Sequence, residues 1–346
     1  MQNNDWSKKT KTKEFNELKD NPKGIQDKKN SDFRPKFLAP KPKNMEKSKF
    51  DFLNQLLWIT PGLIFVLIFS YFSIFIVFRY GFSDGGSVGN FVFSFQQIKF
   101  ILFEDQTREF VYSLRNTFIY VVISVPISLF IALFTAKALS NLLSKKAYGF
   151  FQSTLFLPYV TSSLAVAMVF STLFLNGGDP VINTFMKIFI KDFNVNWREP
   201  KYTMILLVIF GVWRMLPFKI IMFTSAFLRV DKRLYQAASL DGTPKWQQFW
   251  KISLPQILPV IIYMITTSII GGFKFMPLGL FNNYAEARQS SAQTAVYYIF
   301  DKVNPSGGGI PSYGKAGAAS IVLMVLTLLM TIFNKKLSKF LNKKYR

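Results

Sequence analysis

The chain has 346 residues, of which half are hydrophobic, 39 are Phe and only 18% are charged, yet Lys and Arg exceed Asp and Glu so far that the formal net charge is +23. A soluble protein of this length carries more charge and lacks apolar runs of about twenty residues, so the composition predicts a multi-pass membrane protein. The absence of Cys and His excludes disulfides, thiolate or histidine metal sites and histidine bases, and we expect neither a metal nor a cofactor.

Residues 1–50 are rich in Lys, Asn and Asp, with several prolines and few apolar residues. Such a segment cannot bury enough apolar surface to fold, so we expect a disordered basic cytoplasmic tail. The first apolar run comes too late for a cleaved signal peptide and is long enough to span a membrane. A basic tail can also bind nucleic acid, but a solvated segment beside the membrane is the interpretation we favour, with no nucleic-acid partner.

Residues 51–346 are expected to form one all-α integral-membrane domain with six transmembrane helices. A hydrocarbon core of roughly 30 Å takes about 20 residues of helix, and six apolar runs reach that length. These runs cover approximately residues 55–78, 117–138, 151–175, 202–227, 257–281 and 316–334.

The distribution of basic residues predicts the orientation of these helices. If the N-terminus is cytoplasmic, the inner segments hold roughly two thirds of the Lys and Arg residues but only about half of the Asp and Glu residues. Both termini and the insert at residues 228–256 are therefore expected in the cytoplasm.

Two loops on the predicted outer side are longer than turns. The loop at about 79–116 contains an amphipathic piece near Phe95–Phe103, and the loop at about 282–315 is Gly-rich and expected to be flexible. Long outer loops suit the docking of a partner, and unpaired loop is the alternative.

The polar insert between the fourth and fifth runs reads as a helical piece, a break at Asp241-Gly242-Thr243-Pro244 and a second short piece that ends at Pro255. Glycine admits the left-handed backbone of such a break, and proline suits a first helical turn. The insert resembles the EAA loop in permease subunits of binding-protein-dependent ABC importers, although Gln236 and Thr243 replace the glutamate and the last alanine of the family pattern. The matching positions are Ala237, Ala238, Asp241, Gly242, Phe249, Ile252, Leu254 and Pro255.

The rest of the chain is similar to the sugar-permease branch of these importers, the maltose and glycerol-phosphate type, over roughly residues 55–340. The motifs that carry this likeness come one after another at suitable distances: Pro61-Gly62, Phe82-Ser83-Asp84, Asn116-Thr117, Leu155–Pro158, Val212–Pro217 and Gly314–Ala319. The resemblance implies the type I ABC importer permease fold, a cytoplasmic coupling helix in the insert and transport of a sugar or related polyol.

The resemblance also implies partners: a second, similar permease as a heterodimer, two ABC ATPase subunits, an extracytoplasmic solute-binding protein and membrane lipid. The chain lacks a Gly-x-x-x-x-Gly-Lys-Ser/Thr sequence, so ATP hydrolysis is expected on the separate ATPases and the chain is expected not to be an enzyme. The residues implied in ATPase coupling are Gln236, Ala237, Ala238, Asp241, Gly242 and Thr243.

Arg214 lies within the fourth apolar run, where a charge on the lipid face would cost roughly 3 kcal/mol, so it is expected to face the bundle interior. It either lines the solute path or bonds a backbone carbonyl or an acid of a second subunit. Lys219 and Lys274 are placed so that their long stems reach toward an interface. The candidate solute pathway consists of Arg214, Met215 and Phe218 on one helical face, with Ser268, Gly271, Gly272 and Phe275 at i, i+3, i+4 and i+7 on the next. Close packing through small residues explains the two glycines equally well.

Three alternatives belong to other classes or solutes. A self-sufficient secondary carrier usually shows internal repeats or carboxylates inside its spans, and none is found here. A membrane enzyme needs a clustered nucleophile, acid or metal site, which the sequence does not supply. An importer permease for an anionic solute such as glycerol phosphate stays open because of Arg214.

Overall fold

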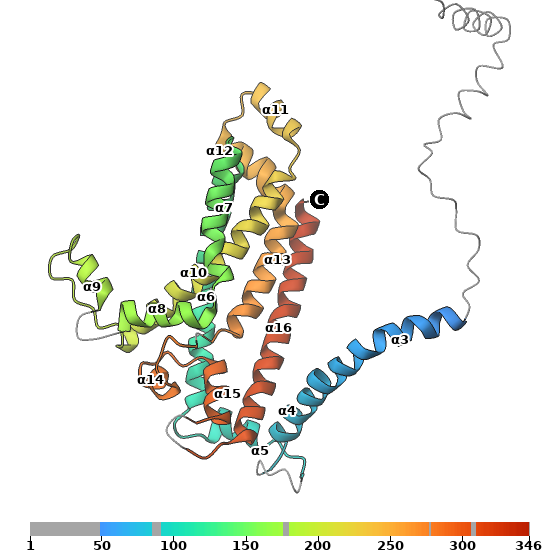
Figure 1. Ribbon diagram of the computed structural model, residues 1–346, viewed down its shortest axis with the longest axis vertical. Helices are drawn as coiled ribbons and strands as arrows, with labels where there is room; N and C mark the ends of the chain where they lie inside the picture. Colours follow the sequence, from blue (N-terminus) through green and yellow to red (C-terminus); the bar gives the residue numbers. More distant parts are fainter. Residues whose placement is uncertain (1–48, 85–90, 176–179, 277, 306–308, 346) are drawn as a thin grey trace, which may run out of the picture. The chain divides into compact units, whose positions relative to one another are not determined.

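The computed structural model describes residues 49–84, 91–175, 180–276, 278–305 and 309–345 (Figure 1). The predicted tail lies outside these residues except for its last two positions. The chain divides into two units, residues 1–68 and 69–346.

The described part of the first unit is helix α3 (Lys49–Val66), which contains Pro61. Its large apolar side chains are exposed, with Trp58 at 87%. A π-helical turn η1 (Leu67–Phe72) continues across the boundary between the units. The helical run Asn54–Gly81 has 28 residues and is long and apolar enough to cross a membrane.

The second unit consists of helices, with two isolated β-bridges as the only extended pairings among its described residues. Its elements in chain order are α4 (Ser73–Gly81), α5 (Gln96–Lys99), η2 (Phe100–Glu104), α6 (Glu109–Ser140), α7 (Lys145–Val160), α8 (Ser163–Leu175), α9 (Val181–Met186), α10 (Pro200–Leu228), α11 (Lys232–Leu240), α12 (Lys245–Gln248), η3 (Phe249–Ser253), α13 (Leu254–Phe273), α14 (Tyr284–Gln289), α15 (Ala295–Val303) and α16 (Tyr313–Tyr345).

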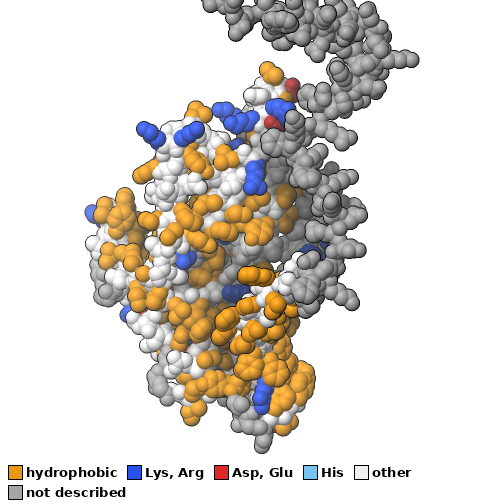
Figure 2. All heavy atoms as spheres, turned by 45° about the vertical axis from the view of Figure 1, so that its right-hand side comes forward, with side chains coloured by type: hydrophobic (Ala, Val, Ile, Leu, Met, Phe, Trp, Pro, Cys, Tyr) orange, Lys and Arg blue, Asp and Glu red, His pale blue; other side chains and the backbone are white. Residues whose placement is uncertain are grey.

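Five helical runs in the described residues are long and apolar enough to span a membrane, and the pair α7 and α8 makes a sixth if it counts as one span. This confirms the all-α, multi-span prediction. Hydrophobic side chains cover much of the middle of the bundle, and Lys and Arg side chains gather near its upper end (Figure 2). Such a surface belongs in a lipid bilayer.

The third predicted run, residues 151–175, is not one straight helix, because α7 and α8 meet at a bend of 92°. Pro158 lies in the last turn of α7, and Thr161 after it has extended backbone. The Thr161 hydroxyl donates to the Pro158 carbonyl at 3.0 Å, which offers the backbone an alternative to a further helical turn. The predicted span at residues 151–175 is therefore a bent pair of helices, and its crossing of the membrane stays a prediction.

Helices α6 and α10 pack closely at the centre of the bundle. Gly211 of α10 faces the Tyr120 ring of α6, and a Cβ at position 211 would lie 2.0 Å from the Tyr120 hydroxyl oxygen. The Tyr120 ring stacks on Phe275 with centroids 4.1 Å apart. Aromatic packing around these residues fixes α6, α10 and the end of α13 together.

Helices α4 and α16 cross at two glycines. A Cβ on Gly317 would lie 2.7 Å from the Gly81 nitrogen and 2.9 Å from the Val77 carbonyl oxygen. Because both neighbours are backbone atoms, only glycine permits this distance between the helices.

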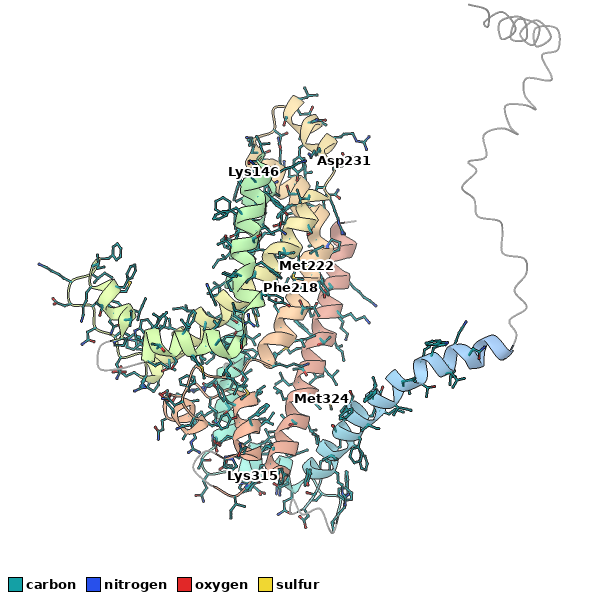
Figure 3. The ribbon with its side chains drawn as sticks, in the orientation of Figure 1. Lys146, Phe218, Met222, Asp231, Lys315 and Met324 are labelled. Carbon is teal, nitrogen blue, oxygen red and sulfur yellow. The ribbon has the colours of Figure 1, made fainter. Side chains whose placement is uncertain are left out.

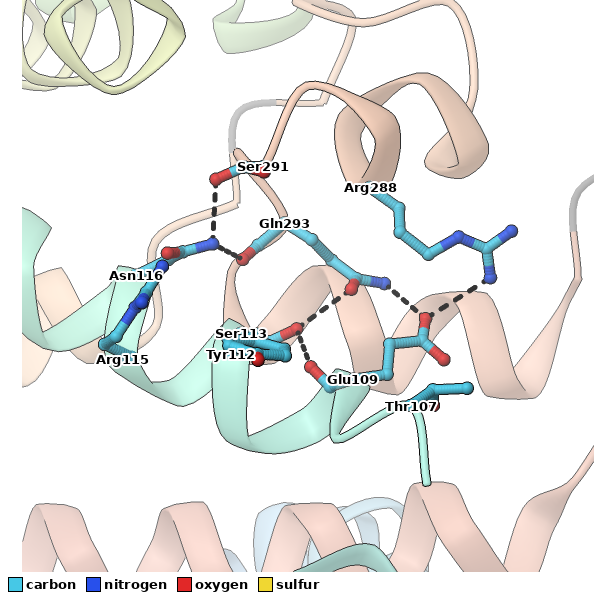
Figure 4. Close-up of a pocket in the computed structure, with 9 residues that line it drawn as sticks. All are labelled: Thr107, Glu109, Tyr112, Ser113, Arg115, Asn116, Arg288, Ser291 and Gln293. Atoms are coloured by element: carbon cyan, nitrogen blue, oxygen red, sulfur yellow. Dashed lines mark hydrogen bonds and ion pairs between the residues drawn. The ribbon is translucent and has the colours of Figure 1, made fainter. Parts of the chain in front are cut away.

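The loop at about 282–315 is more ordered than the sequence predicted, since its described part forms α14 and α15, with Tyr297 and Tyr298 almost fully buried. A polar network fastens it to the start of α6 around a cavity of about 390 Å³ (Figure 4). Glu109 accepts from Lys302 at 2.8 Å and from Gln293 at 3.1 Å. The Asn116 amide donates to the Ser291 carbonyl at 2.8 Å. The glycine-rich residues 306–308 lie outside the described part.

Candidate functional site

The polar insert begins with α11, which starts where the Asp231 carboxylate accepts a hydrogen bond from the Arg233 amide at 2.9 Å. This is an N-cap, and it satisfies one of the free amides of the first turn. The ion pair with the Arg233 side chain holds the pKa of Asp231 below its usual value, so the cap stays charged near neutral pH.

Helix α11 ends in a Schellman motif centred on Gly242. The Thr243 amide donates to the Ala238 carbonyl at 2.9 Å and the Gly242 amide to the Ser239 carbonyl at 3.2 Å. Gly242 has a φ of 72°, which the motif requires and which glycine adopts without strain. The break predicted from the sequence is confirmed at this residue.

The second piece of the insert differs from the prediction. Helix α12, the π-turn η3 and α13 form one apolar run from Lys245 to Phe273, so no short helix ends at Pro255. Pro255 lies in the first turn of α13, where its missing N–H costs little. The π-turn directly before it accommodates the change in hydrogen bonding.

Side chains tie the parts of the insert to one another and to α6. The nearly buried Gln248 amide donates to the Ser239 hydroxyl at 3.1 Å and to the Thr243 carbonyl at 2.8 Å. The hydroxyls of Tyr235 and Ser253 lie 2.7 Å apart. The Lys137 ammonium lies 5.0 Å from the centre of the Tyr235 ring, a cation–π contact from α6.

The six residues predicted for ATPase coupling lie together at the last turn of α11 and the break. Gln236, Ala237, Asp241 and Gly242 are exposed, whereas Ala238 and Thr243 are half-buried. Leu240, which the sequence analysis did not single out, is 90% exposed in the same turn. Small side chains beside an exposed leucine form a surface against which another protein can pack closely.

A cavity of about 280 Å³ lies between α7, α10 and α13. Phe218, which borders it, lies midway between Asp231 and Lys146 at one end and Lys315 at the other (Figure 3). The cavity brings together four of the predicted pathway residues with four others, and its lining is Tyr159, Arg214, Met215, Phe218, Lys219, Met264, Thr267 and Ser268.

The three remaining pathway residues are placed differently. Gly271 lies near Met215, since a Cβ on it would be 3.8 Å from the Met215 methyl carbon. Gly272 packs against Val121 of α6, where a Cβ would approach to 2.8 Å, and Phe275 stacks on Tyr120. For these last two residues the geometry is that of close helix packing.

Arg214 joins α10 to the bend between α7 and α8. One nitrogen of its guanidinium donates to the Pro158 carbonyl and lies 3.4 Å from the Tyr159 carbonyl. These carbonyls belong to the last turn of α7, where a cation is favourable. Arg214 therefore supports the bend and borders the cavity at the same time.

Lys219 is buried, with 3% of its surface exposed, and its ammonium donates to the Ser128 hydroxyl of α6 at 2.5 Å. The interpretation that its stem reaches toward an interface was wrong, because α6 covers it. Lys274, at the C-cap of α13, is exposed as that interpretation expects. The sequence signal that could have found Lys219 is a charge well inside an apolar run.

Several long apolar helices around a polar-edged cavity, with a capped polar helix at one end, define an integral-membrane transport subunit. Residues 124–343 match the family described as binding-protein-dependent transport system inner membrane component. The chain belongs to this family. It is an ABC importer permease, a transport subunit rather than an enzyme.

Relatives cover most of the chain. The probable ABC transporter permease protein MG188 homolog of Mycoplasma pneumoniae is 33% identical over 293 residues, which is 83% of this chain and 87% of that protein. The lactose transport system permease protein LacF of Rhizobium radiobacter is 33% identical over 221 residues, which is 62% of this chain and 72% of that protein. The arabinooligosaccharides transport system permease protein AraP of Bacillus subtilis is 29% identical over 229 residues, which is 65% of this chain and 69% of that protein.

The fold also matches a solved structure. The crystal structure of a bacterial ABC transporter involved in the import of the acidic polysaccharide alginate superimposes with a TM-score of 0.68, at 22% identity, over 84% of this chain and 96% of that one. At this identity the match shows the fold, which is that of an ABC importer permease, as the sequence predicted.

Proposed function

We propose that this permease passes a sugar or related polyol across the cell membrane, powered by separate ABC ATPases that dock on the insert at residues 228–256. The observation that carries the proposal is the exposed last turn of α11 and its Schellman motif, placed at one end of the bundle. The relatives named for lactose and arabinooligosaccharides support the solute class.

The expected assembly contains a second, similar permease, two ATPases and an extracytoplasmic solute-binding protein that delivers the solute. Membership of the binding-protein-dependent family supports a solute-binding protein as one of these partners. Both termini and the insert would face the cytoplasm, and residues 51–346 would form the permease domain behind the basic tail. Alternating access would result from rocking of the two permeases as the ATPases close.

The coupling surface would consist of Gln236 to Thr243 with Leu240 at its centre. The solute would pass the cavity lined by Arg214, Met215, Phe218 and Ser268, with Gly271 behind Met215. Gly272 and Phe275, named for the pathway from their spacing, would act by holding α13 against α6.

Co-purification tests the coupling surface. The tagged permease is purified in mild detergent from cells that also produce its partners, and the ATPase that accompanies it is quantified. Leu240→Asp should lose most of the ATPase, because a carboxylate would be buried in an apolar contact. Leu143→Asp is the matched control, since Leu143 is fully exposed in the α6–α7 connection. Retention of the ATPase by Leu240→Asp, or the absence of any ATPase from the wild-type preparation, would contradict the proposal.

A further inference from the structure

The cavity between α7, α10 and α13 has an uneven charge. Two of its lining residues, Arg214 and Lys219, are cations, and no carboxylate lines it. The three helices that form it contain no Asp or Glu at all. Any negative charge that balances these cations must therefore come from outside these helices.

Lys219 is the more deeply buried of the two cations, and its ammonium has bonding capacity left over. An ammonium group has three N–H donors, and one donates to Ser128. Its residue is 97% buried, so bulk water does not provide the remaining partners in the way it does for a surface lysine. A buried charge of this kind is costly unless an opposite charge reaches it.

Arg214 also keeps free donors toward the cavity. Its bonds to the carbonyls of α7 use one terminal nitrogen of the guanidinium, which leaves the N–H groups of the other two nitrogens as donors. The second permease or the solute can supply the anion that these two cations lack. Both cations border one cavity of about 280 Å³, which has room for an anionic group of the solute.

The rest of the lining suits a ring that carries such a charge. The Tyr159 and Phe218 rings are stacked 5.8 Å apart with an interplanar angle of 18°, and Thr267 and Ser268 lie on the opposite helix. Aromatic faces and hydroxyl groups are the partners of a sugar ring. The volume of about 280 Å³ lies near the lower end for small-molecule sites, roughly 300 Å³, so it would take one such ring at a time.

We propose that this cavity receives an anionic group of the solute, a carboxylate or a phosphate on a sugar or polyol, and that Lys219, held by Ser128, is its ionic contact. The proposal rests on the proposed transport function and narrows its solute class. Arg214 supplies a second donor at the edge of the same cavity.

Equilibrium dialysis of the purified permease complex tests this without the binding protein. The complex is placed in nanodiscs of phosphatidylcholine, so that no anionic lipid competes, and the probes are radiolabelled glucose, glucuronate and glucose 6-phosphate. The wild type should bind at least one charged probe roughly tenfold more tightly than glucose, as expected for a charge-assisted bond. The two charged probes distinguish a carboxylate from a phosphate.

Variants assign the preference to Lys219. Lys219→Met should abolish the preference, Lys219→Arg should keep most of it, and the exposed control Lys274→Met should leave it unchanged. If Lys219→Met does not assemble, Lys219→Gln, which keeps a donor for Ser128, replaces it. A preference that survives in the neutral variant overturns the proposal.

The comparison of charged and neutral probes on the wild-type complex needs no variant and by itself decides whether the cavity prefers an anionic solute. Equal binding of charged and neutral probes would mean that the cations are balanced by another subunit, and the proposal would fail. ATP-dependent uptake of a neutral sugar by the same complex would still support the transport function. Absence of ATP-dependent uptake of any solute would instead remove the proposed function.

Discussion

Gln248 and Ser239 join the two sides of the break in the insert, because the Gln248 amide donates to the Ser239 hydroxyl at 3.1 Å. The run that begins at Lys245 continues without interruption to Phe273, and its middle lines the cavity with Met264 and Ser268. In the proposed mechanism, a displacement of α11 would be passed through this bond to α12 and along α13. This would give a direct route from the proposed coupling surface to the candidate solute path.

Gln248→Leu should weaken that route. The substitution removes the bonds to the Ser239 hydroxyl and the Thr243 carbonyl, each worth about 1 kcal/mol, while it keeps the side-chain volume. We expect less solute taken up per ATP hydrolysed in proteoliposomes. Gln247→Leu is the matched control, because Gln247 is exposed. An unchanged ratio of uptake to hydrolysis in Gln248→Leu would show that the tie is dispensable.

Gly242→Val should uncouple transport and leave the subunit in the membrane. The backbone at Gly242 has a φ of 72°, which costs an L-residue roughly 1–2 kcal/mol and a β-branched one more. No atom of this chain lies within 4 Å of a Cβ at this position, so within the subunit the effect comes from the backbone. Solute-stimulated ATP hydrolysis should fall.

Two substitutions control for this. Gly242→Asn should retain much of the activity, because asparagine tolerates the left-handed region. Gly149→Val adds the same side chain to open space on α7, where φ is helical, and should behave as wild type. If Gly242→Val hydrolyses ATP and transports normally, the conformation of the break does not matter for coupling.

The fold was largely predictable, because apolar runs of spanning length determine membrane helices. The bend after Pro158 was not, since Pro126 and Pro217 lie inside long helices without such a break. At Pro158 two further groups bond the proline carbonyl: the Thr161 hydroxyl turns back to it, and Arg214 of a distant helix donates to the same oxygen. The contact between Arg214 and Pro158 joins residues far apart in the chain, so no local sequence pattern predicts it.

The candidate site was predictable only in part. Helical spacing put Arg214, Met215 and Phe218 on one face of α10, and all three border one cavity. The environment of Lys219 depends on Ser128, 91 positions earlier in the chain, and periodicity within α10 cannot show it. Gly272 and Phe275 fit the same spacing as Ser268, but α6 occupies the space before them. Which face of α13 meets a neighbouring helix depends on packing alone.

Cysteine labelling should establish the orientation. The native chain has no Cys, so single cysteines at Ser7, Thr243 and Asn342 can be tested in intact cells with an impermeant thiol reagent. We expect all three to resist labelling until the membrane is permeabilised. Thr107, exposed in the predicted outer loop just before α6, should react at once as a cysteine. Labelling of Thr243→Cys from outside would refute both the topology and the coupling role.

Gly317→Ala should destabilise the contact between α4 and α16. The added Cβ would meet the Gly81 nitrogen at 2.7 Å, and a backbone atom cannot rotate away. Overpacking of this kind costs roughly 1–3 kcal/mol, so the thermal midpoint of the detergent-solubilised subunit should fall by several degrees. The thermal midpoint of Gly314→Ala should fall much less, because its Cβ would meet only the Gln97 side chain, at 3.2 Å. Equal midpoints for the two variants would argue against a close crossing.

Arg214→Gln separates a structural role from a role in solute contact. The guanidinium bonds the carbonyls of Pro158 and Tyr159, so its loss should loosen the bend between α7 and α8, while the complex remains assembled because no acid is left unpaired on the described helices. Uptake should fall in Arg214→Gln. If charge at the cavity matters, Arg214→Lys should restore part of the uptake. If the bonds to the two carbonyls matter, Arg214→Lys should restore little of it, since an ammonium lacks the planar geometry of a guanidinium. The measurements are the yield of intact complex after mild-detergent purification and the concentration dependence of uptake. Loss of the complex would instead indicate an acid from the partner permease, whose unpaired burial costs roughly 3–5 kcal/mol. Intact complex with unchanged uptake would contradict both roles and place the guanidinium in a water-filled vestibule.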